Sequence, residues 1–289
     1  MESAPVWFIT GCSTGFGGTL ALIALRAGHR VIATSRNPSK TPDLISQIES
    51  LGGKFMTFDV CSPEIGKVLD EATAIYGRID ILVNNAGYAL LGAFEVLSEN
   101  ECRAQMETNF FAPVNIIRHV LPAMRKRKSG IIVNISSTAG LEARPTRSMY
   151  SGSKWALEAV SEALYEEVKP LGIRVIIVQP GAFQTPFSSS ANISDRPLPD
   201  EYDGTSVAQM IALMKDMAER GLNMPGDVNK GAQIIFDYVM KTGSAENIEQ
   251  FLRLPLGKDG SARWEIKLDW LRKNLDGTEA LWKSTDTDP

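Results

Sequence analysis

The sequence predicts an α/β fold in which a single doubly wound parallel sheet carries helices on both faces. Three observations predict it. Short runs rich in Val and Ile alternate with segments of helical periodicity, and the runs are apolar throughout, as strands buried on both faces are. The first run also leads through a glycine-rich turn into the first helical segment. Because parallel strands need crossover connections, this alternation implies right-handed strand–helix–strand units.

The elements follow in a regular order. Strands are expected at residues 6–10, 30–35, 54–59, 79–84, 130–136 and 174–179, and helices at residues 15–27, 43–51, 63–76, 99–128 and 148–169. Beyond them, the patterns predict a polar stretch (187–203), an amphipathic helix (206–221), a helix (227–242), a short strand (250–254) and a helical tail from residue 261. Without repeats or linkers, we expect one domain over 1–289, with a core (4–185), a C-terminal substrate lid (186–226) and C-terminal helices and strand (227–289).

Composition and charge exclude several classes of protein. The 289 residues are 44% hydrophobic and 22% charged, which is ordinary globular composition. With 30 basic and 34 acidic residues, the net charge of −4 argues against a nucleic-acid-binding surface. Three scattered cysteines and two histidines predict no metal site and a reducing, cytoplasmic location. Residues 3–25 carry no charge, but their glycines and Pro5 argue against a membrane span.

Residues 10–17, Thr-Gly-Cys-Ser-Thr-Gly-Phe-Gly, join the first strand to the first helix. The glycines permit a tight turn whose backbone N–H groups can approach a pyrophosphate at the helix N-terminus. The same residues spell G-x-S-x-G, in which Ser13 would be the nucleophile of a serine hydrolase. That alternative needs an acid and then a histidine downstream. The last histidine, His119, lies inside a predicted helix, which favours the dinucleotide interpretation.

The end of the second strand indicates which dinucleotide is bound. An NAD site places Asp or Glu there, but residues 33–37 are Ala-Thr-Ser-Arg-Asn and the next acid is Asp43. Arg36 can form a bidentate pair with a 2′-phosphate, so we expect NADP(H); a merely solvated arginine is the alternative. Asp59, at the end of the third strand, is a candidate contact for the adenine amino group, although such residues also cap helices.

Two Tyr-x-x-x-Lys pairs lie in the predicted helix 148–169, where residues four apart share a face. A nearby ammonium lowers the pKa of a phenol and makes it a general acid or base. Tyr150 and Lys154 begin the helix soon after Ser137, which follows a strand at the carboxyl edge of the sheet, where ligands of such folds bind. Tyr165 and Lys169 end the helix beside charged residues, which is typical of a surface or packing tyrosine.

Taken in order, these motifs resemble the classical short-chain dehydrogenase/reductase family, with its Rossmann fold, over nearly the full chain. The matching positions are residues 10–17, Asn84-Asn85-Ala86-Gly87, Asn109, Ser137, Tyr150-x-x-x-Lys154 and Pro180-Gly181. A looser similarity to the hydroxysteroid and retinol dehydrogenase branch rests on the Cys-Ser-Thr turn, Ala-Thr-Ser-Arg after the second strand, and Pro-Gly-Ala-Phe-Gln-Thr.

The resemblance implies a role for each catalytic residue. Tyr150 protonates the carbonyl oxygen during reduction, and Ser137 hydrogen-bonds to that oxygen as charge develops. Lys154 holds the nicotinamide ribose and depresses the pKa of Tyr150. Asn109 keeps a helix kink open for a water relay toward Lys154; an asparagine that is merely bonded locally is the alternative.

The resemblance also implies the binding residues. Residues 84–87 would pass under the adenosine, with Asn85 the main contact, and Gly181 and Thr185 would frame the carboxamide. The complete cofactor set is Gly11, Ser13, Thr14, Gly15, Phe16, Gly17, Arg36, Asp59, Asn85, Ala86, Gly87, Tyr150, Lys154, Pro180, Gly181 and Thr185. On the substrate side stand Tyr88, Leu141, Glu142, Phe183 and Phe187.

A stripe of Val207, Met210, Ile211, Met214 and Met217 in the amphipathic helix suits an irregular apolar ligand, although such stripes are often plain core. We therefore expect an NADPH-dependent reductase of a hydrophobic ketone or aldehyde. A dehydratase, an epimerase or an imine reductase on the same fold remains an alternative, and a non-catalytic NADPH-binding regulator a distant one. By analogy with the family, a homodimer or homotetramer would pair through the helices at 99–128 and 148–169.

Overall fold

The computed structural model describes residues 4–189, 191–220 and 223–287. A seven-stranded sheet in the order β3-β2-β1-β4-β6-β7-β9 forms its centre, and every neighbouring pair is parallel. The strands are β1 (Val6–Ile9), β2 (Arg30–Ser35), β3 (Lys54–Thr57), β4 (Ile81–Asn84), β6 (Gly130–Ile135), β7 (Ile173–Pro180) and β9 (Arg253–Leu256). The strand order reverses between β1 and β4, which is where ligands of doubly wound sheets bind. The predicted fold class is confirmed.

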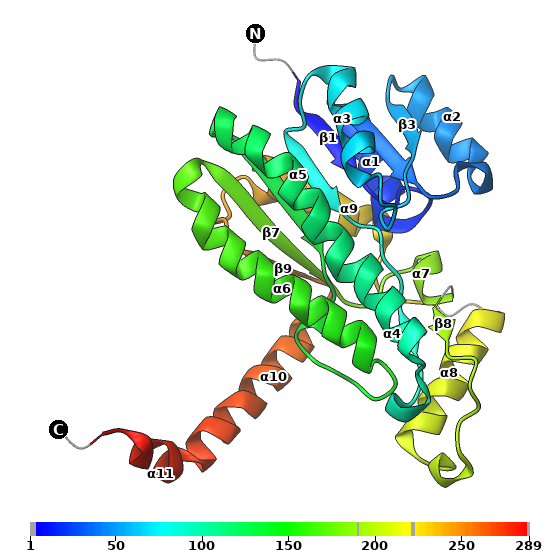
Figure 1. Cartoon of the computed structure of the whole chain (residues 1–289), viewed down its shortest axis with the longest axis vertical. Coiled ribbons are helices and arrows are strands. Elements are labelled where there is room, and N and C mark those ends of the chain that lie inside the picture. The colour runs from blue at the N-terminus through cyan, green and yellow to red at the C-terminus, as the bar shows by residue number, and fades with distance from the viewer. Residues whose placement is uncertain (1–3, 190, 221–222, 288–289) are drawn as a thin grey trace.

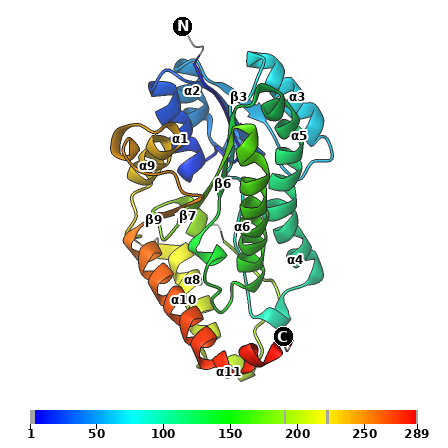
Figure 2. The ribbon, with the colours of Figure 1, turned by 90° about the vertical axis from the view of Figure 1, so that its left-hand side faces the viewer.

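Helices cover both faces of this sheet (Figures 1 and 2). Those in the first three quarters of the chain are α1 (Gly15–Arg26), α2 (Pro42–Ser50), α3 (Ile65–Tyr76), α4 (Glu99–Met106), α5 (Ala112–Arg127), α6 (Ser148–Val168), α7 (Pro186–Ser189) and α8 (Ser206–Arg220). After them come α9 (Val228–Met240), α10 (Lys258–Gly277) and α11 (Glu279–Trp282). In the part of the chain that the structure describes, no helix is both long and apolar enough to cross a membrane.

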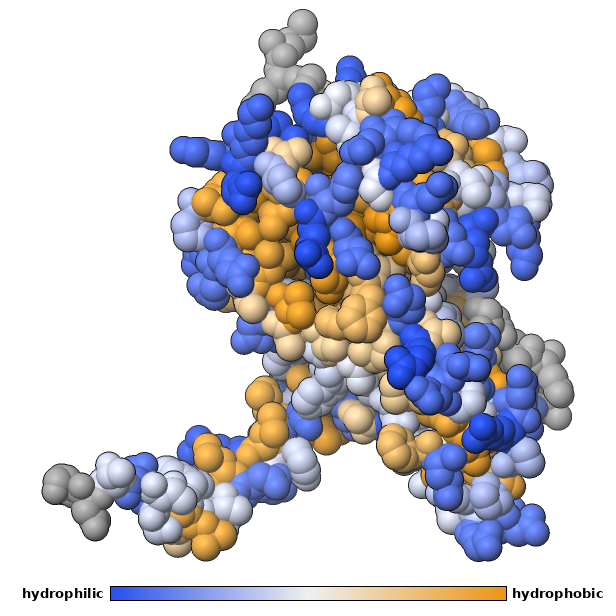
Figure 3. Space-filling model, viewed as in Figure 1, coloured by the Kyte–Doolittle hydropathy of each residue, from blue (hydrophilic) through white to orange (hydrophobic). Residues whose placement is uncertain are grey.

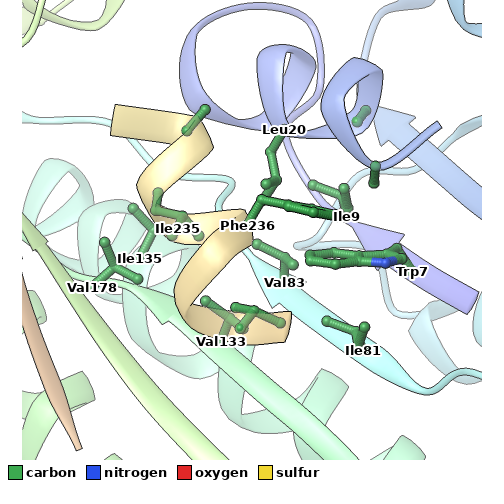
Figure 4. Close-up of a cluster of buried hydrophobic side chains, with 14 of the residues drawn as sticks. Trp7, Ile9, Leu20, Ile81, Val83, Val133, Ile135, Val178, Ile235 and Phe236 are labelled. Atoms are coloured by element: carbon green, nitrogen blue, oxygen red, sulfur yellow. The ribbon is translucent and has the colours of Figure 1, made fainter. Parts of the chain in front are cut away.

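Alternate side chains of each strand point to opposite faces, which divides the core in two. On one face, Trp7 and Ile9 of β1 pack with α1 and with Phe236 of α9; the rings of Trp7 and Phe236 stack 5.7 Å apart (Figure 4). On the other face, Val6 and Phe8 pack against α3, α5 and α6. The five inner strands are therefore buried on both faces, as their uninterrupted apolar runs predict, whereas the edge strands β3 and β9 are partly exposed.

Two strands begin later than the sequence predicts. β4 starts at Ile81 because the Asp80 carboxylate, just before it, accepts a hydrogen bond from the backbone of Val6 at 2.9 Å. β9 covers Arg253–Leu256, since the backbone N–H of Phe251 donates to the hydroxyl of Tyr238 at 2.5 Å instead of to a neighbouring strand.

The segment predicted as a lid contains α7, α8 and the short strand β8 (Asn192–Ile193), which pairs with β5 (Leu90–Leu91). Residues 190, 221 and 222 of that prediction, and the side chain of Met217, lie outside the described residues. In Figure 1, α8 and the α10–α11 segment extend on separate sides below the sheet, and they form two separate projections in the same view in Figure 3.

Candidate active site

Ser137, Tyr150 and Lys154 meet at the carboxyl edge of the sheet. Ser137 follows β6, while Tyr150 and Lys154 lie one turn apart near the start of α6. Both side chains of the pair are buried, at 5% exposed each, and Ser137 is half-buried. The second pair, Tyr165 and Lys169, lies at the far end of α6, where the ammonium stacks over the ring at 5.4 Å. The two pairs are thus separated as the sequence predicts.

Tyr150 is held in its neutral form. Burial raises the pKa of its phenol, and the hydrogen bond with Ser137 and the charge of Arg147 oppose that rise. The sequence predicts that Lys154 lowers this pKa, but in the structure the net shift is upward, and the groups that oppose it are Ser137 and Arg147. A protonated phenol hydrogen-bonded to a neighbouring hydroxyl can donate a proton to an oxygen placed between them.

Lys154 is a buried cation. Its Nζ donates a hydrogen bond to the carbonyl oxygen of Ile135, at 2.7 Å, at the end of β6. Burial lowers the pKa of Lys154 to about 8, and the negative charge of Glu158 opposes the shift. The ammonium is therefore bonded to the end of β6. At neutral pH it is charged, but it lies within about one pH unit of losing its proton.

Asn109 lies where the predicted helix 99–128 is interrupted. Residues Glu107–Phe111 form a π-helical turn between α4 and α5, and Asn109 is 1% exposed within it. Its Oδ1 accepts from the backbone N–H of Tyr88 at 3.2 Å, and its Nδ2 donates to the Tyr88 carbonyl at 3.0 Å and to Ser153 Oγ at 3.1 Å. Ser153 in turn donates to the carbonyl of Tyr150 at 2.7 Å, so the π-turn positions the helix turn that carries the tyrosine.

The glycine-rich turn, residues 11–17, has the shape that a pyrophosphate site needs. Gly11 and Gly15 have φ values of +70° and +59°, which favour glycine. A Cβ on Gly17 would lie 2.6 Å from the Gly11 carbonyl oxygen. Thr14, the N-cap of α1, makes no side-chain hydrogen bond to the first turn, and that turn holds no acid. The helix N-terminus thus fits an anion.

The edge beside β2 fits a phosphorylated ribose. Arg36 is exposed directly after β2 and makes no ion pair within the described residues. Ser35 beside it is 4% exposed, and its hydroxyl has no hydrogen-bond partner among those residues. Asp59 is half-buried, and one of its oxygens accepts from the backbone N–H of Cys61 at 3.0 Å; the N-cap of the next helix, α3, is Glu64, so Asp59 does not cap it.

Two loops flank the glycine-rich turn. On one side the amide of Asn85 donates to the carbonyls of Thr10 and Gly11, at 2.9 and 3.0 Å, so this side chain shapes the turn itself. On the other side, a Cβ on Gly15 would meet Thr185 at 3.5 Å. Ala86, Gly87 and Gly181 belong to the same two loops, Pro180 ends β7, and Ser13 and Phe16 belong to the turn.

Gly87 and Gly181 need their lack of a side chain. A Cβ on Gly87 would lie 3.0 Å from Asn109 Oδ1 and 3.8 Å from Lys154 Nζ, which places this glycine beside two predicted catalytic residues. A Cβ on Gly181 would collide with the Asp259 carboxylate, which accepts from the backbone N–H of Ala182 at 2.8 Å.

The predicted substrate residues separate into two groups. The ring of Phe187 lies 6.0 Å from that of Tyr150, and the backbone of Tyr88 is fixed by Asn109. Leu141 and Glu142 follow the 3-10 turn Thr138–Gly140, next to Ser137. Phe183 instead belongs to the core beneath α1, where its ring meets Phe16 at 5.0 Å. Because of that packing, we leave Phe183 out of the substrate wall.

The surroundings of Tyr150 are apolar. It packs in a small cluster of its own, whose buried members are Ala89, Leu91, Ala139, Tyr150 and Met214, with Met210 and Ile193 against them. Of the methionine stripe, Met210 and Met214 are therefore placed beside the tyrosine. An apolar ligand group fits these neighbours.

Glu158 was not predicted from the sequence. It lies one turn beyond Lys154, is 4% exposed, and accepts hydrogen bonds from Ser136 at 2.6 Å and Gln179 at 2.9 Å. Arg253 of β9 pairs with it at 3.2 Å. Burial raises the pKa of Glu158, and these three partners oppose the rise. The available signal was an acid on the buried face of a helix, four residues after a lysine.

The hydrolase alternative finds no histidine at Ser13. His29 accepts from Trp7 Nε1 at 2.9 Å, and His119 bonds Asp70 at 2.8 Å on the opposite side of the sheet. Among the described residues, no group of three His, Cys, Asp or Glu side chains could hold a metal ion.

Comparison with known proteins gives consistent similarities. A family model described as short chain dehydrogenase matches residues 5–195. An oxidoreductase of Passalora fulva, claN, is 46% identical over 185 residues, which cover 64% of this chain and 84% of claN. A 3-ketodihydrosphingosine reductase of Bacteroides thetaiotaomicron is 43% identical over 189 residues, 65% of this chain and 67% of that protein.

Solved structures agree. A short-chain dehydrogenase from Streptomyces avermitilis is 37% identical, with a TM-score of 0.87 over 99% of this chain and all of that one. Two more distant structures show the shared fold alone. One from Burkholderia phymatum, in complex with NAD, is 20% identical (TM-score 0.73; 99% and 98% covered), and one from Sphingobium yanoikuyae, in complex with NADPH, is 24% identical (0.69; 94% and 95%).

Proposed function

Because this chain belongs to the short-chain dehydrogenase family, we propose that it is an NADP(H)-dependent reductase of hydrophobic ketones or aldehydes. The family predicted from the motifs is confirmed, and with it the oxidoreductase class. The observation that carries the finer proposal is the meeting of Ser137, Tyr150 and Lys154 at the sheet edge, beside a turn shaped for a pyrophosphate. We propose Ser137, Tyr150, Lys154 and Asn109 as the catalytic set.

The proposed chemistry follows from the protonation states. When bound, the reduced nicotinamide supplies a hydride to the carbonyl carbon. Tyr150 donates its phenolic proton to the carbonyl oxygen, and Ser137 donates a hydrogen bond to the charge that develops there. The raised pKa of Tyr150 keeps that proton in place at neutral pH, as reduction requires. Lys154 would hold the nicotinamide ribose, and Asn109 would keep the π-turn open for a water relay toward Lys154.

Arg36 supports NADP(H) over NAD(H). Its guanidinium is exposed and unpaired within the described residues, beside a buried Ser35 hydroxyl that has no partner there. Both groups suit a 2′-phosphate. We expect Arg36→Ala to raise the KM for NADPH about tenfold to a hundredfold, the effect of one lost charged hydrogen bond, while the KM for NADH stays unchanged. Arg26→Ala, at the end of α1, serves as the control. An equal loss for both cofactors would contradict this role.

The apolar cluster at Tyr150 supports a hydrophobic substrate. One relative is named as a reductase of 3-ketodihydrosphingosine, which makes a lipid-like ketone a reasonable class to test. We also propose a homodimer or homotetramer that pairs through the α4–α5 segment and α6, where Phe111 of the π-turn and Trp155 and Val160 of α6 are exposed. A reducing, cytoplasmic compartment is proposed as well, supported by three cysteines that form no disulfide.

A panel of aliphatic and aromatic ketones and aldehydes tests the function. We expect NADPH consumption, matched by formation of the corresponding alcohol, to increase with the apolar area of the substrate. Consumption without an alcohol product, or turnover of small polar ketones only, would contradict the proposal.

A further inference from the structure

Arg147 is a cation without a counter-ion beside the proposed active site. It precedes α6, three residues before Tyr150, and is half-buried. Its Nη2 contacts the sulfur of Met214 in α8 at 3.9 Å, and Met214 packs in the same cluster as Tyr150. No carboxylate among the described residues forms an ion pair with Arg147.

Glu142, the acid whose charge acts on Arg147, is already engaged. Glu142 pairs with Arg144 at 3.2 Å and with Arg263 of α10 at 3.1 Å. Two guanidinium groups therefore share this carboxylate, and the third, Arg147, has no bond to it. Burial lowers the pKa of Arg147, and Arg144 and Arg263 add to that effect. An arginine in such a place is stabilised by an anion that arrives with a ligand.

Unpartnered polar atoms gather in the same segment. Of the seven buried side-chain atoms without a hydrogen-bond partner in the described part of the chain, four belong to Thr146, Arg147, Ser148 and Ser151. Thr146 and Ser151 are more than nine-tenths buried. Thr146 also has a φ of +69°, rare for a β-branched residue. Unsatisfied groups and strained backbone that concentrate at one place indicate a binding function.

We propose that Arg147 binds an anionic group of the substrate, a carboxylate or a phosphate, and thereby selects carbonyl compounds that carry a negative charge on an apolar body. The inference rests on the proposed function, because it extends the same active site. The apolar cluster of Tyr150 and Met214 would contact the body, and the guanidinium would form two parallel hydrogen bonds to the oxyanion. Arg147 is thus a specificity-determining residue rather than a catalytic one.

Paired substrates test this with NADPH as the reductant. Straight-chain oxo-carboxylic acids are compared with their methyl esters, so that only the charge differs. We expect the wild type to favour the acid in kcat/KM by about tenfold to a hundredfold, Arg147→Leu to lose the preference, and Arg147→Lys to keep part of it. Arg144→Leu removes the same charge from the same cluster, and we expect it to keep the preference. Equal loss in both leucine variants, or no preference in the wild type, would overturn the inference.

A binding measurement separates this inference from the proposed reaction. Calorimetry compares decanoate, decyl phosphate and decanol on the wild type and on Arg147→Leu. Tighter binding of either anion than of decanol, lost in the variant, supports the site and shows which oxyanion fits. If it is found without turnover of any ketone, the anion site stands and the reductase proposal fails. If decanol binds as well as both anions and esters are reduced as well as acids, the anion site fails and the reductase stands.

Discussion

At the scale of single residues, Lys154 carries a positive charge in a buried position, so its titration should appear in the pH dependence of stability. Its pKa falls from 10.5 to about 8 on folding. Below pH 8 the ammonium is charged in both the folded and unfolded chain, so the whole penalty for burying it remains. The penalty declines as pH rises from 8 toward 10.5, because over this range Lys154 has lost its proton in the folded chain and keeps it in the unfolded chain.

Lys154→Met should therefore stabilise the protein while it abolishes reduction. At pH 7 the pKa shift corresponds to a penalty of about 3 kcal/mol in the free energy of unfolding. The substitution removes this penalty but also loses about 1 kcal/mol from the hydrogen bond to Ile135. Between pH 7 and pH 9.5, denaturant unfolding should show the free energy of unfolding of the wild type rising by about 2 kcal/mol relative to that of the variant. Exposed Lys230→Met is the control. Parallel pH curves for wild type and Lys154→Met would show that the buried charge is not destabilising.

Arg147 and Tyr150 are coupled at the same scale. The positive charge of Arg147 lowers the pKa of Tyr150, so Arg147→Leu should raise it. The alkaline limb of kcat/KM for reduction of a neutral ketone should move to higher pH in the variant, because the phenol keeps its proton longer. An unmoved limb would show that the limb belongs to another group, with Lys154 the first candidate.

At the scale of elements, α6 presents Tyr150, Lys154 and Glu158 at four-residue intervals on one buried face. The first pair could be predicted because motif and position after a strand agree. Glu158 could not be predicted, since a glutamate in a helix is usually solvent-exposed and the sequence does not show that Ser136, Gln179 and Arg253 surround it.

Glu158→Gln tests this face of α6. The carboxylate raises the pKa of Lys154, so its loss should lower that pKa below about 8, and the pH profile of the free energy of unfolding should begin to rise at a lower pH. Glu162→Gln is a matched control, because Glu162 pairs with the same Arg253 at 2.6 Å but is 60% exposed. If both variants shift the profile equally, Glu158 acts through Arg253 rather than on Lys154.

Other elements show where sequence reasoning ends. The inner strands of the sheet could be predicted because they are apolar on both faces, and only the ends of the strands moved. The pattern of residues 99–128 stays amphipathic through the π-turn at Glu107–Phe111. The periodicity therefore does not indicate the interruption, which is expected only from the family resemblance. The packing of Phe183 against Phe16 joins positions far apart in sequence, which no local pattern reports.

At the scale of the whole molecule, the α10–α11 segment extends away from the sheet with apolar side chains exposed (Figures 1 and 3). The exposed side chains are Ile266, Leu268, Trp270, Leu271, Leu275, Leu281 and Trp282. A surface of this kind is typical of a protein contact. Together with the exposed Trp155 of α6, over which Lys267 of α10 lies at 5.2 Å, it supports pairing of two copies.

Leu268→Glu combined with Leu275→Glu should lower the sedimentation coefficient toward that of a monomer, with the circular dichroism of the core unchanged. Leu213→Glu, an exposed leucine on α8, should leave the assembly intact. An assembly that survives the double substitution would exclude this segment from the contact.

The central claim is that Tyr150 is the proton donor in hydride transfer, and single-turnover reduction of a neutral hydrophobic ketone tests it most directly. Tyr150→Phe should bind NADPH as the wild type does and transfer hydride at least about a hundredfold more slowly. Tyr165→Phe is the control, because Tyr165 is the other tyrosine of α6 that has a lysine four residues later. This variant should react at the wild-type rate. Hydride transfer at an undiminished rate in Tyr150→Phe, or an equal loss in Tyr165→Phe, would contradict the account.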